Sequence, residues 1–238
     1  MRNILKHIKT SVESKTKLLA VLIDPDKLKT EALSQFVNKV NSSIATHIFV
    51  GGSTVETDVT QRLLTALRSL TNLPIVLFPG DVTQISNDAD AILFLSLVSG
   101  RNPEYLIGQH VKSVSTLRKT NLEVIPTGYI LIDGGKETAT LKVTKTSPLT
   151  IKSEIVDTAK AAELLGMKLI YLEAGSGAKQ EVSSEIIKAV KQEVSIPLIV
   201  GGGIRNKTQL DNAYKAGADL VVIGTAFEKD ESFFNKLK

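Results

Sequence analysis

The sequence predicts a single (β/α)₈ TIM barrel that spans residues 1–238, with its third helix reduced or absent. The length of 238 residues suits one such barrel. Eight short apolar runs recur along the chain, and their nearly continuous hydrophobicity is typical of parallel strands covered on both faces. An open doubly wound sheet is the competing arrangement, but repeated strand–helix units without a second domain favour closure into a barrel.

The expected strands are rich in valine, isoleucine and leucine and are separated by more polar segments. They cover Leu18–Ile23, Thr46–Val50, Ile75–Phe78, Ala91–Leu95, Leu122–Ile125 together with Tyr129–Ile132, Lys168–Leu172, Leu198–Val200 and Leu220–Ile223.

The expected helices lie between these strands, and several carry recognisable ends. Ser53 and Glu56 have the spacing of a capping box, Asn102 precedes a proline, and Gly166 follows a helical pattern as a C-terminal glycine. The helices are expected at Thr30–Val40, from Ser53 to Leu70, from Asn102 to Leu117, and at Ser153–Leu165, Ser184–Val194, Asn206–Ala216 and Glu228–Leu237.

Three segments depart from this regular pattern. The stretch between Phe78 and Ala91 is too short for an ordinary helix with two loops, which predicts the reduced third helix. Asp133–Thr150 is expected to form a long loop after the fifth strand, and long loops in compact domains are often functional. The residues before the first strand, including His7, are interpreted as a tail.

Composition narrows the classes of function. The absence of cysteine excludes disulfides, thiolate metal sites and thiol catalysis. The net charge of +4 is spread along the chain, which does not indicate nucleic-acid binding; it suits an anionic substrate or simply a mildly basic surface. His47 and His110 are expected to be structural. A cytoplasmic location with at most peripheral membrane contact is expected, because no signal peptide or membrane span is visible. The chain is also expected to form a homo-oligomer.

Glycines cluster where the last three strands end. Gly201–Gly203 follows the seventh strand, Gly224-Thr225 follows the eighth, and Gly175-Ser176-Gly177 follows the sixth. Glycines allow backbone N–H groups to approach an anion, and the loops after strands seven and eight are the recurrent phosphate site of this fold. Turn glycines are the plainer alternative, but two such sites on adjacent late strands predict a bound phosphate.

Carboxylates lie on the same rim. Glu173 ends an apolar strand, where partial desolvation would raise its pKa and suit a general base; a structural carboxylate that caps backbone N–H groups is the alternative. Asp24 and Asp26 follow the first strand, and beside a phosphate site Asp24 is a candidate ligand for Mg²⁺, although in isolation turn chemistry or a helix cap would explain them better. Ser53 faces the metal or only caps its helix, and Lys27 neutralises a diphosphate or is a solvated charge.

Taken together, these motifs resemble one family. Leu22–Lys27, Val50–Ser53, Phe78–Gly80, Tyr171–Gly177, Val200–Arg205 and Gly224-Thr225 are similar to the geranylgeranylglyceryl phosphate synthase family, the PcrB-like prenyltransferases. The likeness runs from Leu22 to about Phe227. The late glycines are shared with many phosphate-binding barrels, whereas the earlier motifs in this order are more specific. Asp133–Thr150 resembles the archaeal and Bacteroidetes-type group.

The resemblance implies a reaction and a set of ligands. sn-Glycerol 1-phosphate and geranylgeranyl diphosphate would give 3-O-geranylgeranylglyceryl phosphate and pyrophosphate, with Mg²⁺ at the positions of Asp24 and Ser53. The positions expected to bind glycerol phosphate are Tyr171, Leu172, Glu173, Ala174, Gly175, Ser176, Gly177, Gly202, Gly203, Gly224 and Thr225.

The same reaction suggests roles for the remaining rim residues. Glu173 would take the proton of the glycerol hydroxyl, Lys27 would stabilise the pyrophosphate, and Tyr129 would face the developing allylic cation. Phe78, Phe94 and Leu97 are candidates for a prenyl groove; the alternative for all three is a place in the barrel core, which fits Phe94 better.

Two other functions remain open from the residues alone. A phosphate-binding barrel isomerase or lyase of the histidine- or tryptophan-pathway kind shares the late glycines but gives no reason for Asp24 and Ser53. A non-catalytic phosphate sensor would have no use for Glu173.

Overall fold

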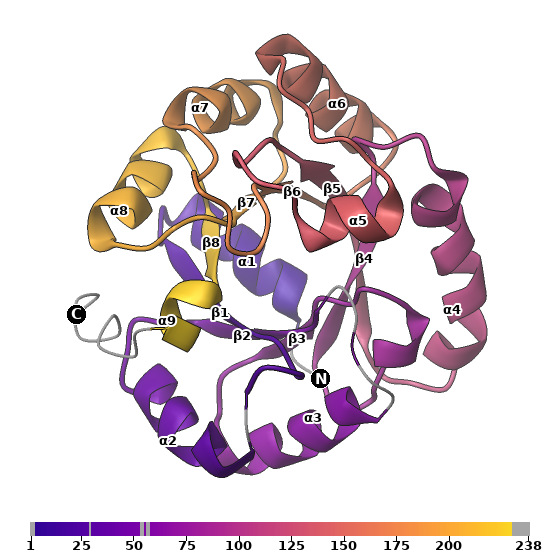
Figure 1. The fold of residues 1–238 in the computed structure, drawn as a ribbon, viewed down its shortest axis with the longest axis vertical. Coiled ribbons are helices and arrows are strands. Elements are labelled where there is room, and N and C mark those ends of the chain that lie inside the picture. The colour runs from indigo at the N-terminus through magenta and orange to yellow at the C-terminus, as the bar shows by residue number, and fades with distance from the viewer. Residues whose placement is uncertain (1–2, 29, 53–54, 56–57, 230–238) are drawn as a thin grey trace.

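The structure, a computed structural model, describes residues 3–28, 30–52, 55 and 58–229. Eight parallel strands close into a barrel in sequence order, with β1 paired to both β2 and β8. Figure 1 shows the strands at the centre and the helices around them. The predicted (β/α)₈ barrel is therefore confirmed.

The strands agree closely with the apolar runs. They are β1 (Leu18–Ile23), β2 (His47–Val50), β3 (Ile75–Leu77), β4 (Ala91–Leu97), β5 (Glu123–Leu131), β6 (Leu169–Glu173), β7 (Leu198–Gly201) and β8 (Leu220–Ile223). β5 is one continuous strand through Pro126 and Gly128, where two apolar runs were expected.

The helical elements alternate with the strands. They are α1 (Ile4–Glu13), α2 (Thr30–Asn41), α3 (Val59–Leu70), η1 (Val82–Gln84), η2 (Glu104–Gly108), α4 (Gln109–Leu117), α5 (Ala139–Thr144), α6 (Lys152–Leu164), α7 (Ser184–Glu193), α8 (Lys207–Ala216) and α9 (Thr225–Lys229).

The predicted loss of the third helix is confirmed, because only the 3₁₀ turn η1 connects β3 to β4. The predicted helix after Asn102 begins with the π-helical turn η2. Ser53 and Glu56, which define the expected capping box, lie outside the described residues, and the described part of that helix begins at Val59. The last described helix begins at Thr225, before the expected start at Glu228.

The interpretation of the N-terminus as a tail is wrong. α1 lies across the far end of the barrel in Figure 1, and Ile4 and Ile8 are buried among side chains of the barrel interior. Asn3 caps the helix through the backbone N–H of Lys6, and the Glu123 carboxylate accepts the backbone N–H groups of Ile4 and Leu5. α1 therefore plugs the end of the barrel opposite the strand C-termini.

The interpretation of Asp133–Thr150 as loop alone is also wrong. It contains α5, whose first turn is capped by the Thr138 hydroxyl and whose end is marked by Lys145 at φ +56°. α5 lies over the C-terminal mouth of the barrel in Figure 1. The segment therefore contributes a short helix to the roof of that mouth.

Alternate residues of each strand face different cores. On β6, Leu169 and Tyr171 join the barrel interior, whereas Ile170 and Leu172 join the layer between strands and helices. The same alternation places Glu173 inward, at the C-terminal end of the barrel, where it lines the cavity.

In the described part of the chain, no helix has the length and hydropathy needed to cross a membrane.

The packing of α1 leads to a stability prediction. Ile8→Ala should lower the free energy of unfolding by about 2–4 kcal/mol, because a fully buried side chain is lost from the barrel plug. Its neighbour Lys9 is exposed, so Lys9→Ala should change the stability by less than about 0.5 kcal/mol. Urea unfolding of both variants measures the difference, and equally small effects would contradict the plug.

Candidate functional site

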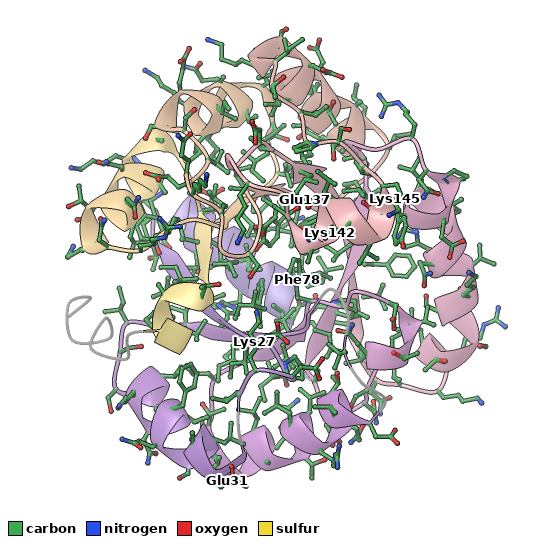
Figure 2. The ribbon with its side chains drawn as sticks, in the orientation of Figure 1. Lys27, Glu31, Phe78, Glu137, Lys142 and Lys145 are labelled. Atoms are coloured by element: carbon green, nitrogen blue, oxygen red, sulfur yellow. The ribbon has the colours of Figure 1, made fainter. Side chains whose placement is uncertain are left out.

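A cavity of about 540 Å³ opens at the C-terminal ends of the strands. Figure 2 shows Phe78 near the centre of this mouth, with Lys27 on one side and Lys142 of α5 and Lys145, directly after α5, on the other. The expected site residues that line the cavity are Asp24, Lys27, Tyr129, Tyr171, Glu173, Ser176, Gly177, Gly202, Gly203, Gly224 and Thr225. The barrel therefore brings together residues from both ends of the sequence.

Some expected residues do not line the cavity. The side chains of Leu172 and Ala174 pack outward, in the layer between strands and helices. Gly175 instead contributes its backbone, which donates a hydrogen bond to Glu173. Ser53 lies outside the described residues.

The glycines after β6 and β7 allow two loops to approach closely. Gly202 has φ +82°, and a Cβ there would lie 2.5 Å from Glu173 Oε1 and 2.6 Å from the backbone nitrogen of Gly175. Ser176 Oγ lies 3.3 Å from Thr225 Oγ1, which connects the β6 loop to the start of α9. This wall of backbone and hydroxyl groups suits an anion such as phosphate.

Glu173 is the buried carboxylate of this wall. Its side chain is 6% exposed, and Oε1 accepts the Gly175 backbone N–H at 2.5 Å. Burial raises the pKa of Glu173 to about 7, while hydrogen bonds from Gly175 and Tyr171 oppose part of that rise. A carboxylate that exchanges its proton near neutral pH suits general acid–base chemistry.

Three aromatic rings surround the approach to Glu173. The Tyr171 ring centroid lies 5.2 Å from that of Phe78 and 5.4 Å from that of Tyr129. Burial, followed by the charge of Glu173, raises the pKa of both tyrosines, so their hydroxyls stay protonated. The Thr140 side chain of α5 hydrogen-bonds Tyr129 and thereby ties α5 to this cluster.

Asp24 forms the opposite side of the cavity, after β1. Its Oδ2 lies 2.8 Å from Lys27 Nζ, and Oδ1 accepts the backbone N–H of Asp26 at 3.2 Å. A Cβ at position 52 would lie 2.9 Å from Asp24 Oδ1, so Gly52 keeps the space beside this oxygen clear.

These contacts bear on whether Mg²⁺ fits here. No cluster of three or more His, Cys, Asp or Glu side chains suited to a metal occurs among the described residues. Mg²⁺ commonly uses one or two carboxylates, several waters and substrate phosphates. The Asp24 carboxylate and the cleared space at Gly52 therefore fit such an ion.

Gln84 of η1 is a residue that the sequence interpretation missed. Its buried amide pairs with both backbone groups of Gly52: Nε2 donates to the Gly52 carbonyl at 2.9 Å, and Oε1 accepts the Gly52 N–H at 3.3 Å. The turn that replaces the third helix thus holds the loop beside Asp24. No local sequence pattern marks a glutamine for this role.

The cavity has an apolar arm where the third helix is missing. β3 pairs with β4 only at Val76–Ala91 and Leu77–Ile92, whereas β4 continues to Leu97. On this side the cavity is lined by apolar and aromatic residues, including Ile85, Ile92 and Phe94. Phe78 and Leu97 also line the cavity, but from the barrel interior.

Phe94 marks where the arm reaches α4. It is half-buried and packs against the His110 ring at a centroid distance of 4.2 Å. The expectation that Phe94 belongs to the barrel core is therefore wrong, because β4 turns this residue outward into the arm. His110 is buried as expected of a structural histidine, but it also lines the cavity.

A closed barrel with glycine loops, a buried carboxylate and a two-part cavity is typical of TIM-barrel enzymes. Residues 12–238 match the model of the PcrB family. The chain therefore belongs to the PcrB family, and the expectation that it is a prenyltransferase is confirmed.

Relatives and solved structures agree with this assignment. Geranylgeranylglyceryl phosphate synthase from Flavobacterium johnsoniae is 58% identical over 221 residues, which cover 92% of this chain and 91% of the relative. The enzyme of the same name from Zunongwangia profunda is 55% identical over 233 residues, covering 97% and 99% of the two chains.

A solved structure shares the fold over the whole chain. (S)-3-O-Geranylgeranylglyceryl phosphate synthase from Thermoplasma acidophilum, crystallised in complex with its substrate sn-glycerol-1-phosphate, has a TM-score of 0.93 and 31% identity. The match covers 100% of this chain and 96% of that one.

The raised pKa of Glu173 predicts a pH-dependent stability. Between pH 4.5 and about 7 the unfolded chain releases this proton and the folded protein keeps it, so burial of Glu173 costs stability as the pH rises. Glu173→Gln removes this titration. Its free energy of unfolding relative to wild type should therefore increase by about 3 kcal/mol from about pH 4 to about pH 8. Urea unfolding of both proteins across this pH range measures the difference. A difference in unfolding free energy that does not change with pH would contradict the raised pKa.

Proposed function

We propose that the chain joins sn-glycerol 1-phosphate to geranylgeranyl diphosphate, giving 3-O-geranylgeranylglyceryl phosphate and pyrophosphate. The observation that carries the proposal is the position of Glu173, a buried carboxylate between the glycine loops and the apolar arm of one cavity. The names of the relatives and the glycerol phosphate complex of the Thermoplasma enzyme support it.

The acceptor would bind at the late strands. Backbone groups of Ser176, Gly177, Gly202, Gly203, Gly224 and Thr225 would surround its phosphate, with the Ser176 and Thr225 hydroxyls as further donors. This placement directs the glycerol hydroxyls toward Glu173, because that carboxylate lies beside Gly202 and Gly175.

The donor's diphosphate would bind at the early strands. Asp24, together with Ser53, would hold Mg²⁺, and Lys27, already paired with Asp24, would contact the same diphosphate. A bound Mg²⁺ would supply positive charge that favours departure of pyrophosphate. Gln84 keeps Gly52 in place beside this region.

Bond formation would then take place between the two halves. The oxygen of the glycerol C3 hydroxyl forms a bond to C1 of the prenyl chain as the C1–O bond to the diphosphate breaks. Glu173 accepts the hydroxyl proton, and pyrophosphate leaves with the bonding electrons. The ring of Tyr129, which packs against Phe78 and Tyr171, would favour positive charge that develops on the allylic carbon.

The apolar arm accounts for the prenyl chain. Phe78, Phe94 and Leu97 would contact it, and the C20 donor follows from the resemblance of Asp133–Thr150 to the archaeal and Bacteroidetes-type group. An isomerase or lyase of small phosphorylated metabolites has no use for such an arm.

The proposal is tested by product formation. The purified protein, incubated with glycerol 1-phosphate, labelled geranylgeranyl diphosphate and Mg²⁺, should give a phosphatase-sensitive ether lipid detected by chromatography. EDTA should abolish the product and excess Mg²⁺ restore it. Absence of product with both C20 and C35 donors would refute the proposed reaction, and full activity in EDTA would refute the metal.

The role of Glu173 predicts a separation of binding from turnover. Glu173→Gln should lower kcat by about a hundred-fold to ten-thousand-fold, since general bases contribute that range. Its Kd for glycerol 1-phosphate should stay within several-fold, because the glutamine retains an acceptor for Gly175.

The control is Glu185→Gln, an exposed carboxylate on α7 that pairs with Lys152 away from the cavity. Steady-state kinetics and calorimetry of both variants measure the effect. A Glu173→Gln enzyme with wild-type kcat would remove Glu173 from the role of base.

A further inference from the structure

Arg205 follows the glycine-rich end of β7 and holds the neighbouring loop. We propose that Arg205 is a positioning residue, which fixes the loop after β6 so that the backbone of Gly175–Gly177 faces the acceptor phosphate. The inference rests on the proposed function for the identity of the ligand, but the contacts that support it are present in the protein alone.

The guanidinium of Arg205 reaches across to the β6 loop. Nη2 donates to the Ala178 carbonyl, and Nη1 donates to the Lys179 carbonyl at 3.3 Å. Both acceptors lie in the loop that runs from β6 to α7. The planar guanidinium can bind two successive carbonyls, whereas the single ammonium of a lysine has no such fork.

A second side chain reinforces this connection. Gln209 of α8 accepts the Arg205 backbone N–H through Oε1 at 2.8 Å and donates from Nε2 to Glu181 Oε2 at 2.8 Å. The β7–α8 unit therefore binds the β6 loop at three positions, Ala178, Lys179 and Glu181.

The same loop is held from its other side. The Gly134 carbonyl, after β5, accepts the backbone N–H groups of Lys179 and Gln180 at 2.9 and 3.1 Å. A Cβ at Gly203 would lie 2.5 Å from the Gln180 carbonyl oxygen, so the β7 loop packs directly on this segment. Residues 178–181 are thus fixed between the loops after β5 and β7.

The fixed segment matters because the residues before it have little conformational preference. Gly175 and Gly177 have φ +103° and +68°, values that glycine adopts freely but does not enforce. Their positions must therefore be set by the two ends of the turn. Glu173 holds the first end through the Gly175 N–H, and Arg205 holds the second through Ala178.

A direct contact between Arg205 and the phosphate is the competing role, since Arg205 also lines the cavity. The two roles differ in the unliganded protein. A positioning residue orders the loop without ligand, whereas a direct ligand contact affects only the complex.

The test compares Arg205→Met and Arg205→Lys with Lys207→Met. Lys207 is an exposed cation two residues further on, paired with Asp211 at 2.9 Å, so its substitution removes the same charge without touching the β6 loop. Hydrogen–deuterium exchange of peptides covering 174–182 is measured without ligand. Calorimetry then gives the Kd for glycerol 1-phosphate, and kinetics give the KM for geranylgeranyl diphosphate.

Both Arg205 variants should exchange faster in this loop and bind glycerol 1-phosphate about ten-fold more weakly. Their KM for the prenyl donor should stay within about two-fold, because the donor site is separate. Lys207→Met should match wild type in all three measurements.

Several outcomes would overturn the inference. Unchanged exchange in both Arg205 variants, with weaker binding, would assign a direct phosphate contact. Wild-type exchange and affinity in Arg205→Lys would show that charge alone suffices, and this variant decides the matter if Arg205→Met does not fold. Failure of the wild-type protein to bind glycerol 1-phosphate would instead refute the proposed acceptor. The exchange rates without ligand would still show whether Arg205 orders the β6 loop.

Discussion

The short pairing between β3 and the longer β4 is the constraint on which the shape of the cavity depends. Barrel closure brings all eight strand ends to one mouth, but β3 has three residues and β4 has seven. The end of β4 therefore continues past its neighbour, and the 3₁₀ turn η1 is too short to cover the flank. A polar mouth is thereby joined to an apolar arm within one continuous cavity.

Glu173, the buried carboxylate between the polar mouth and the apolar arm, is subject to opposing influences on its protonation. Burial favours the protonated form of Glu173, while the Gly175 N–H and the Tyr171 hydroxyl favour the charged form. Neither influence eliminates the other, so the pKa lies near neutrality and not at either extreme. The fold supports this unfavourable group because β6 is buried along its whole length, with Tyr171 fully enclosed. Stability elsewhere thus allows a reactive group inside the site.

The sequence predicts those features that depend on local patterning. Buried parallel strands are continuous apolar runs, so their positions were predictable, as was the missing third helix from the short gap before Ala91. Glycines and carboxylates that directly follow strands must meet at one mouth once a barrel closes, which is why Asp24 and Glu173 were identified although they are distant in sequence.

Features that depend on distant partners were not predictable. The apolar residues of α1 have helical spacing, but only the closed barrel reveals that Ile4 and Ile8 fill its end while Glu123 caps the helix. The six residues of α5 are too short for a periodic signal. Phe94 has the character of a core residue, and only the end of β3 explains why it lines the arm. Gln84 acquires its role solely from the position of Gly52.

A site built from glycine backbone requires side chains from elsewhere to hold it. Glycine loops approach a ligand closely but lose more conformational entropy on ordering than other residues do. In two places a side chain offsets this entropy loss. Gln84 binds both backbone groups of Gly52 on the Asp24 side. Arg205 binds two carbonyls of the β6 loop on the Glu173 side. In each case the side chain belongs to the following β-strand unit. Closure of the barrel thus brings to each of these two loops a side chain from the unit that follows it, and the order of the site depends on that closure.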